Sequence, residues 1–239
     1  MDSPGIRKAE WVLEGASQVV TCAPGRGDAP GVIERGVVAG IGEKILAVGT
    51  AAEVGKIADL SGAERLDAGG GVVLPGFVDS HTHLVFGGTR LDEYVAKCTG
   101  ADLEPLRARG IAGVNASVSA TRDATLESLV LQAGARLTNM IECGTTTVEA
   151  KSGYGFTTES ETRMLEAAAE LGRRLPVDVL PTFLGAHGWP PETTKAAYID
   201  LIVNEMLPEV AARKLAVFCD AWCEDTHFSA SECGRILAA

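Results

Sequence analysis

The sequence is short of basic side chains, of histidine and of long apolar runs. Its 239 residues carry 21 Lys and Arg against 32 Asp and Glu, which gives a net charge of −11. A chain with this charge repels nucleic acids and anionic membranes, so we expect neither as a partner. No stretch reaches the roughly 18 to 20 apolar residues that a membrane helix needs. Residues 1–15 contain no apolar signal core either, so we expect a cytoplasmic protein.

The six cysteines include no CxxC pair, and their scattered spacing indicates reduced thiols rather than a disulfide framework. Cys219 and Cys223 both fall within the apolar run AVFCDAWCE, which is typical of a strand. Four residues of strand span about 13 Å, which is too far for a disulfide between these two side chains. We therefore expect buried structural thiols at both positions.

The pattern of the chain changes near residue 70. Short alternating apolar runs between glycines and charged turns predict a small β-sheet unit over residues 1–70. Residues 71–239 alternate apolar runs with amphipathic segments, which is typical of a parallel α/β sheet. A barrel and a doubly wound sheet share this pattern. No GxGxxG motif follows a strand, which argues against a doubly wound sheet that binds a nucleotide. The predicted strands are 72–78, 145–150, 177–184 and 215–222.

Amphipathic segments between these strands predict helices over 126–141, 158–171 and 198–206. Thr158 and Glu161 have the spacing of a capping box at the start of the second helix. Pro208 is expected to bend or end the third helix. Residues 97–122 are polar, contain three glycines and have no clear period, so we expect a long loop that acts as a lid.

His81 and His83, two of the four histidines, lie two residues apart at the end of the first predicted strand. Strand side chains alternate faces, so both imidazoles point the same way and can converge on one metal ion. Two ligands do not close a metal site, so this motif is weak by itself. Asp79, just before them, either orients an imidazole or caps a turn.

Other polar side chains follow the first and second strands. Arg90, in a glycine-containing loop, either clamps a substrate carboxylate or is a solvated surface residue. Tyr154 lies between two glycines after the second strand, where its hydroxyl either contacts a ligand or the ring simply packs. Lys151, three residues earlier, either is catalytic or pairs with Glu149 or another acid.

The third and fourth strands are each followed by a histidine. His187 ends the third strand. There it is a metal ligand, a proton-transfer group or a structural hydrogen-bonding residue. His227 follows the fourth strand in a polar stretch, and we expect it at the surface. His81, His83, Tyr154 and His187 end three successive strands, and side chains at strand ends on one barrel face reach a common pocket. We therefore expect these four residues to form one site.

The run LPGFVDSHTH resembles the first barrel strand of the amidohydrolase superfamily. The ordered set HTHLVFGGTR, GTTTVEAKSGYG, FLGAHGWPPE and DAWCED is similar to the imidazolonepropionase family, the hydrolases of histidine degradation. This resemblance runs from about residue 31 onward and implies a metal-dependent (β/α)8 barrel with a small β-sandwich. Residues 1–70 would be the sandwich segment and residues 71–239 the first half of the barrel. It also implies hydrolysis of the cyclic amide C–N bond of 4-imidazolone-5-propanoate to N-formimidoyl-L-glutamate.

The resemblance implies a role for each strand-end residue. His81 and His83 would hold one zinc or iron ion, Arg90 would bind the propionate, and Tyr154 would contact the substrate. His187 would contact the ring and help to polarise its carbonyl, as a catalytic residue. The family's third histidine ligand, its glutamate and its final aspartate ligand have no counterpart in the chain, so we expect an N-terminal portion with little activity alone. We expect a small-molecule substrate and a homodimer.

Two alternatives stay open. The lid departs from the family pattern at Leu103 and at 109–112, which leaves room for a related amidohydrolase acting on another cyclic amide or heterocycle. The missing ligands leave room for an inactive fragment or a module that depends on a partner.

Overall fold

The computed structural model describes residues 6–23 and 30–239. The chain divides into two compact units, Met1–Pro75 and Gly76–Ala239. The described helices include none that is both long enough and apolar enough to cross a membrane.

The first unit consists of short strands and one short helix, α1 (Ala51–Val54). Its sheets have the strand orders β6-β5-β2-β8, β4-β3-β9 and β1-β7. Val12 of β2 and Ala39 of β5 are fully buried, because alternate strand residues face the same side, and Val54 of α1 packs in the same cluster. The strands are β1 (Arg7–Lys8), β2 (Trp11–Glu14), β3 (Gln18–Val20), β4 (Val32–Glu34), β5 (Val37–Ile41), β6 (Lys44–Gly49), β7 (Ala58–Asp59), β8 (Glu64–Asp67) and β9 (Val72–Val73).

The apolar run 72–78 is two strands rather than the single strand that its composition predicts. β9 pairs in parallel with β3 of the first unit, whereas the next strand begins only at Phe77. Pro75, which separates them, has no N–H to donate to a ladder, and proline is therefore excluded from the interior of a sheet.

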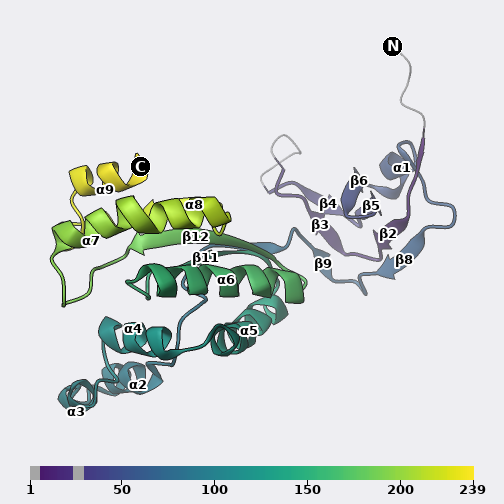
Figure 1. Ribbon diagram of the computed structural model, residues 1–239. Helices are drawn as coiled ribbons and strands as arrows, with labels where there is room; N and C mark the ends of the chain where they lie inside the picture. Colours follow the sequence, from purple (N-terminus) through teal and green to yellow (C-terminus); the bar gives the residue numbers. More distant parts are fainter. Residues whose placement is uncertain (1–5, 24–29) are drawn as a thin grey trace. The chain divides into compact units, whose positions relative to one another are not determined.

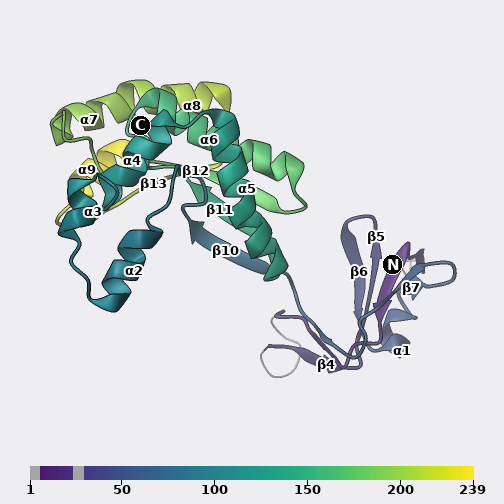
Figure 2. The ribbon, with the colours of Figure 1, turned by 90° about the horizontal axis from the view of Figure 1, so that it is seen from below.

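The second unit contains a four-stranded, fully parallel sheet in the order β10-β11-β12-β13 (Figure 2). The fold is therefore mixed α/β, as the alternation of strand and helix patterns predicts. Parallel register brings the carboxyl ends of the strands to one edge, where Lys151 is opposite Thr182 and Ala186 is opposite Ala221. The strands are β10 (Phe77–Thr82), β11 (Thr145–Lys151), β12 (Asp178–Ala186) and β13 (Phe218–Ala221).

Helices follow each strand of this sheet. In Figure 1, α6 runs alongside β12 and α8 runs alongside α6. The helix after β12 changes character just before Pro208, as a π-helical turn at Ile202–Met206 follows α7 and a new segment, α8, begins at Leu207. Pro208 lies in the first turn of that segment, where its missing N–H costs no helical hydrogen bond. The helices are α5 (Leu126–Glu142), α6 (Thr158–Arg174), α7 (Lys195–Leu201), α8 (Leu207–Arg213) and α9 (Ala230–Leu237).

The start of α6 differs from the expected capping box. Thr157, not Thr158, is the N-cap, and its side chain accepts a hydrogen bond from the Ser160 N–H. Glu161 therefore lies one residue too far along the helix to complete the box. Its side chain turns inward instead and is fully buried.

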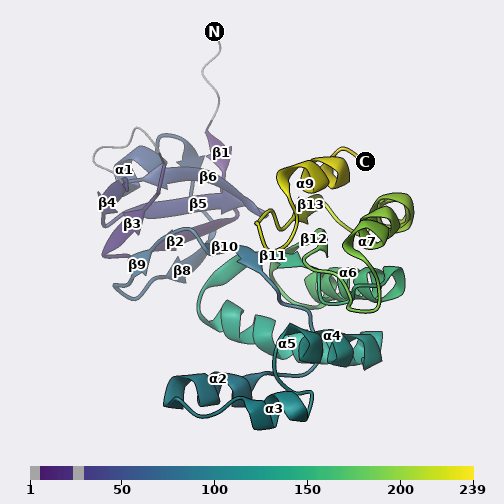
Figure 3. The same cartoon turned by 90° about the vertical axis from the view of Figure 1, so that its left-hand side faces the viewer.

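The stretch expected to be a long loop is mostly helical. It includes the end of α2 (Leu91–Thr99), all of α3 (Glu104–Ala108) and nearly all of α4 (Val114–Asp123). Figure 3 shows α2 and α3 as the outermost layer, beyond α4 and α5. Gly100 and Gly113 have φ values of 69° and 81°, so these glycines delimit helices rather than mark a loop. None of the three helices runs for more than three turns, which is why no helical period is visible in the sequence.

Candidate active site

The structure brings the expected strand-end residues together at the carboxyl edge of the parallel sheet. The ring centroids of His81 and His83 are 6.2 Å apart. The His83 ring lies 4.4 Å from that of His187 and 5.0 Å from that of Tyr154. Tyr154 and His187 are 5.2 Å apart, edge to face. One compact cluster of four rings therefore comes from three neighbouring strands.

His83 has the most strongly shifted pKa of this cluster. Burial, with smaller contributions from the charges of His187, His81 and Lys151, lowers the pKa of His83 to about 3. Its imidazole is therefore neutral at pH 7, which is the form that binds a metal. Its Nδ1 is buried and has no hydrogen-bond partner among the described residues. Throughout residues 6–23 and 30–239, no group of three or more His, Cys, Asp or Glu side chains is arranged to hold a metal ion.

His187 is held in one tautomer by the backbone. Its Nδ1 lies 2.9 Å from the carbonyl oxygen of Gly153, and because a carbonyl only accepts, Nδ1 carries the proton. Burial lowers the pKa of His187, while the bond to Gly153 acts in the opposite direction. In the neutral ring Nε2 is therefore an acceptor, free to take a proton.

His187 belongs to a column of stacked rings that the sequence did not reveal. It stacks on His83 on one side and on Trp222 on the other, with the Trp222 centroid 5.0 Å away and the planes 28° apart. Trp222 in turn stacks on His227 at 3.7 Å. His227, expected at the surface, is partly exposed, because stacking on the indole leaves its side chain 28% exposed. The position of Trp222, directly after a strand, was the signal that could have found it.

Tyr154 and Arg90 lie close enough to influence each other. Burial raises the pKa of the Tyr154 phenol, and the positive charge of Arg90 opposes that rise. Arg90 occupies the N-cap position of α2, and its guanidinium lies 3.8 Å from the Glu93 carboxylate. It is half-buried beside the ring cluster rather than a fully solvated residue.

The loop between His83 and Arg90 is held by Arg136 of α5, which sequence reasoning missed. Its guanidinium donates to the carbonyls of Leu84, Phe86 and Gly88 at 3.0 to 3.1 Å and lies 3.6 Å from the centre of the Phe86 ring. Burial lowers the pKa of Arg136, but an arginine stays charged near neutral pH.

Lys151 pairs with acids, the second of the two roles considered for it. Its ammonium lies 2.8 Å from Glu149 and 2.9 Å from Asp220, and Thr182 donates to the same Glu149 oxygen at 2.6 Å. Burial alone would lower the pKa of Lys151, but the bonds to these carboxylates outweigh it and raise that pKa. This network joins β11, β12 and β13 behind the rings.

Asp79 contacts backbone rather than an imidazole. Its Oδ1 lies 3.5 Å from the backbone nitrogen of His81, a long contact from an exposed side chain. Of the two roles considered for it, this geometry favours the local turn role.

The expectation of buried thiols at Cys219 and Cys223 was wrong, since both are exposed and free. β13 pairs only with β12 among the described strands, so its outer edge and neighbouring side chains such as Phe218 stay open to solvent. Cys223 also lies beyond the end of β13, because the strand stops at Ala221.

Solved structures with the same fold include a deaminase and a chlorohydrolase complexed with zinc. Escherichia coli guanine deaminase matches with a TM-score of 0.57 and 15% identity, over 95% of this chain and 49% of that one. A mutant of atrazine chlorohydrolase from Arthrobacter aurescens, complexed with zinc and atraton, matches with a TM-score of 0.50 and 18% identity, over 84% and 42%. At these identities the likeness shows the fold alone.

Sequence relatives are much closer, although a scan of protein-family models gave no match. Imidazolonepropionase of Symbiobacterium thermophilum is 43% identical over 97% of this chain and 56% of its own length. Those of Erwinia tasmaniensis and Chloroflexus aggregans are each 41% identical, over 93% and 98% of this chain and 54% and 58% of their own lengths. The chain thus spans about half the length of the curated relatives it matches. Across that span, it belongs to the imidazolonepropionase family.

Proposed function

We propose that the protein to which this chain contributes hydrolyses the ring C–N bond of 4-imidazolone-5-propanoate and gives N-formimidoyl-L-glutamate. The observation that carries the proposal is the convergence of His81, His83, Tyr154 and His187 at the ends of three adjacent strands. The relatives of this sequence, whose names state that activity, align over nearly all of it.

The sheet order supports half of a (β/α)8 barrel as the scaffold of this activity. The strands β10 to β13 are parallel and adjacent in the order of the sequence. A doubly wound sheet reverses its strand order at the ligand site, whereas a barrel continues in one direction. Residues 1–75 would then supply the β-sandwich segment of the same architecture.

His81 and His83 fit a divalent metal, zinc or iron, as the resident ion. The neutral His83 ring has a buried Nδ1 without a described partner, and His81 lies beside it. Imidazole nitrogens suit both metals, and further ligands complete such a site. When bound, the ion lowers the pKa of a coordinated water so that hydroxide is available near neutral pH.

The chain's own residues would bind and orient the substrate. The Arg90 guanidinium would pair with the propionate and fix the angle of the ring. The Tyr154 hydroxyl would contact the substrate from the facing side. Because Nδ1 of His187 carries the proton that bonds to the Gly153 carbonyl, Nε2 is unprotonated. Nε2 would accept a proton and then donate it to the carbonyl oxygen of the substrate ring or to the departing ring nitrogen.

The test uses the full-length protein that contains this chain. We expect one metal ion per subunit, hydrolysis of imidazolonepropionate, loss of activity on chelation and recovery on adding zinc or iron. His83→Ala is expected to lose both metal and activity. Stoichiometric metal without turnover of this substrate, or turnover only of other cyclic amides, would contradict the proposal.

A further inference from the structure

The carboxylate of Glu161 holds the loop that carries Tyr154. Glu161 belongs to the first turns of α6 and its exposed fraction is 0%. One of its oxygens accepts the N–H of Gly153 at 2.8 Å, and the other accepts the N–H groups of Gly155 and Phe156 at 2.7 and 2.9 Å. Three backbone donors of one loop thus converge on one side chain, and Tyr154 lies between the first and the second of them.

The carboxylate acts as an acceptor on both oxygens. Burial raises the pKa of Glu161, and bonds from the Ser152 side chain and from the three backbone N–H groups act in the opposite direction. A carboxylate that receives only donors is satisfied in its ionised form, close to the positive end of a helix dipole. The helix itself does not need Glu161 as a cap, because Thr157 already fills that place.

The loop fits tightly against both neighbours. Gly153 has φ = 109° and Phe156 has φ = 56°, conformations that few side chains adopt. A Cβ added to Gly153 would lie 2.8 Å from the Cβ of His187, and one added to Gly155 would lie 2.7 Å from the backbone nitrogen of Glu161. Arg122 of α4 supports the loop from outside by donating to the Gly155 carbonyl at 2.7 Å.

Gly153 connects Glu161 to His187. Its N–H donates to Glu161, and its carbonyl accepts the Nδ1–H that fixes the tautomer of His187. A displacement of the Gly153 backbone would therefore move the Tyr154 ring and release the His187 imidazole together.

We propose that Glu161 is a positioning residue of the active site, which sets the places of both Tyr154 and His187 through the backbone of residues 153–156. The proposal rests on the proposed function, because it assigns the two positioned side chains to that reaction. Glu161 lies behind the loop, so it acts through these residues and does not touch the substrate.

The experiment tests the variant Glu161→Gln in the full-length protein. Glutamine keeps the shape of the side chain, but its NH₂ group cannot accept a hydrogen bond from the backbone N–H that it faces. We expect hydrogen exchange of the Gly153, Gly155 and Phe156 amides to accelerate by about tenfold or more. The ring ¹⁵N spectrum of His187 is expected to show loss of the pure Nδ1–H tautomer. We expect kcat to fall about 10- to 100-fold, as for small displacements of reacting groups, with a smaller change in KM.

Two matched variants of α6 separate positioning from stability. The hydroxyl of Thr162, which is buried next to Glu161, bonds only to carbonyls of its own helix. Thr162→Val is therefore expected to leave the three amides and kcat unchanged. Leu171→Ala removes a fully buried side chain at the far end of the helix and serves as the stability-matched control.

Unchanged exchange at the three amides in Glu161→Gln, or a kcat loss no greater than that of Leu171→Ala, would overturn the proposal. If Glu161→Gln fails to fold, Glu161→Asp withdraws the carboxylate by one methylene and is expected to expose the same three amides. Amide exchange and kcat equal to those of the wild type in Glu161→Asp would overturn the proposal equally.

The amide-exchange and ring ¹⁵N measurements need no substrate. A wild-type protein that does not turn over imidazolonepropionate would therefore contradict the proposed function and not the positioning role of Glu161.

Discussion

The imidazole of His187 stacks on that of His83, with the ring centroids 4.4 Å apart and the planes inclined by 24°. The proton-transfer group that we propose therefore lies directly against the more buried of the two proposed metal ligands. A shift of the His187 ring would disturb its stacking contact with His83, so the groups that hold His187 also support the proposed metal site.

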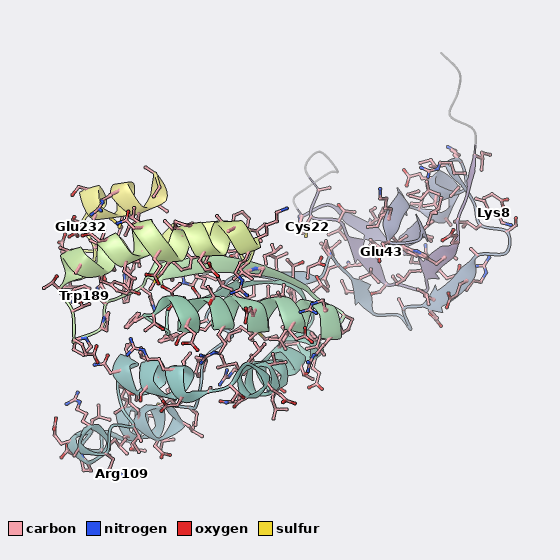
Figure 4. All side chains as sticks on the ribbon, viewed as in Figure 1. Lys8, Cys22, Glu43, Arg109, Trp189 and Glu232 are labelled. Atoms are coloured by element: carbon pink, nitrogen blue, oxygen red, sulfur yellow. The ribbon has the colours of Figure 1, made fainter. Side chains whose placement is uncertain are left out.

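Trp222→Leu is expected to lower kcat/KM about three- to tenfold. The substitution removes the ring on the outer side of His187, and an aromatic contact contributes about 0.5 to 1.5 kcal/mol beyond its buried area. Steady-state kinetics of the full-length protein measure the effect. Trp189→Leu is the control, because Trp189 lies on the loop after β12 and packs on Phe228 instead (Figure 4). Equal losses in both variants would contradict a role for the stacked rings.

Arg90→Ala is expected to raise KM for imidazolonepropionate about 10- to 100-fold, because it removes charge-assisted hydrogen bonds to the propionate. An analogue without the carboxylate should show no such change between wild type and variant. Arg173, exposed in the last turn of α6, supplies the control Arg173→Ala, which should leave KM unchanged. A KM increase that is the same for both substrates would argue against carboxylate binding.

Lys151→Met is expected to lower the free energy of unfolding by about 2 to 4 kcal/mol. The change leaves Glu149 and Asp220 without their shared cation. Breaking a buried pair costs about 3 to 5 kcal/mol, and the partial exposure of Asp220 reduces that loss. Urea unfolding measures it. Arg174→Met, which removes an exposed partner of Glu170, should cost less than about 1 kcal/mol.

Acid is expected to loosen the contact between α2 and the start of α4 through Glu93. The Lys97 ammonium and the Gly113 N–H, which bond to its buried carboxylate at 2.5 and 2.8 Å, lower the pKa of Glu93. A depressed carboxyl pKa stabilises the fold above the unfolded pKa of about 4.3, and this contribution is lost as the pH falls through the lower folded value.

The measurement compares thermal unfolding of wild type and Glu93→Gln from about pH 7 to pH 3. Wild type should melt higher at neutral pH, and its advantage should shrink on acidification. An advantage that stays constant or grows at low pH would contradict this account of Glu93. Groups elsewhere titrate in both proteins and cancel in the difference.

Sequence patterns predicted the features that depend on residues close together in the chain. The alternation of strands and helices, the extent of α5 and the strand-end placement of His83, Tyr154 and His187 all follow from periodicity and from the geometry of parallel strands. The pairing of Lys151 with Glu149, two residues away, could also be anticipated.

What the patterns missed depends on contacts between distant residues. Asp220 meets Lys151 across 69 positions, and Trp222 meets His187 only because β12 and β13 are neighbours. Glu161 matched a local capping rule, but the loop that follows β11 supplied three stronger donors and turned its side chain inward. The helices α2 to α4 escaped detection because each is too short to show a period.

The close approach of Gly153 to His187 and of Gly155 to α6 has a consequence for how the site could be adapted to other substrate rings. Side chains cannot be added at either glycine without moving the backbone, so these two positions are closed to variation in evolution or design. Between them, Tyr154 projects its side chain from a fixed base. New specificity would therefore have to come from Tyr154 itself or from the helices α2 to α4, where the chain is not constrained in this way.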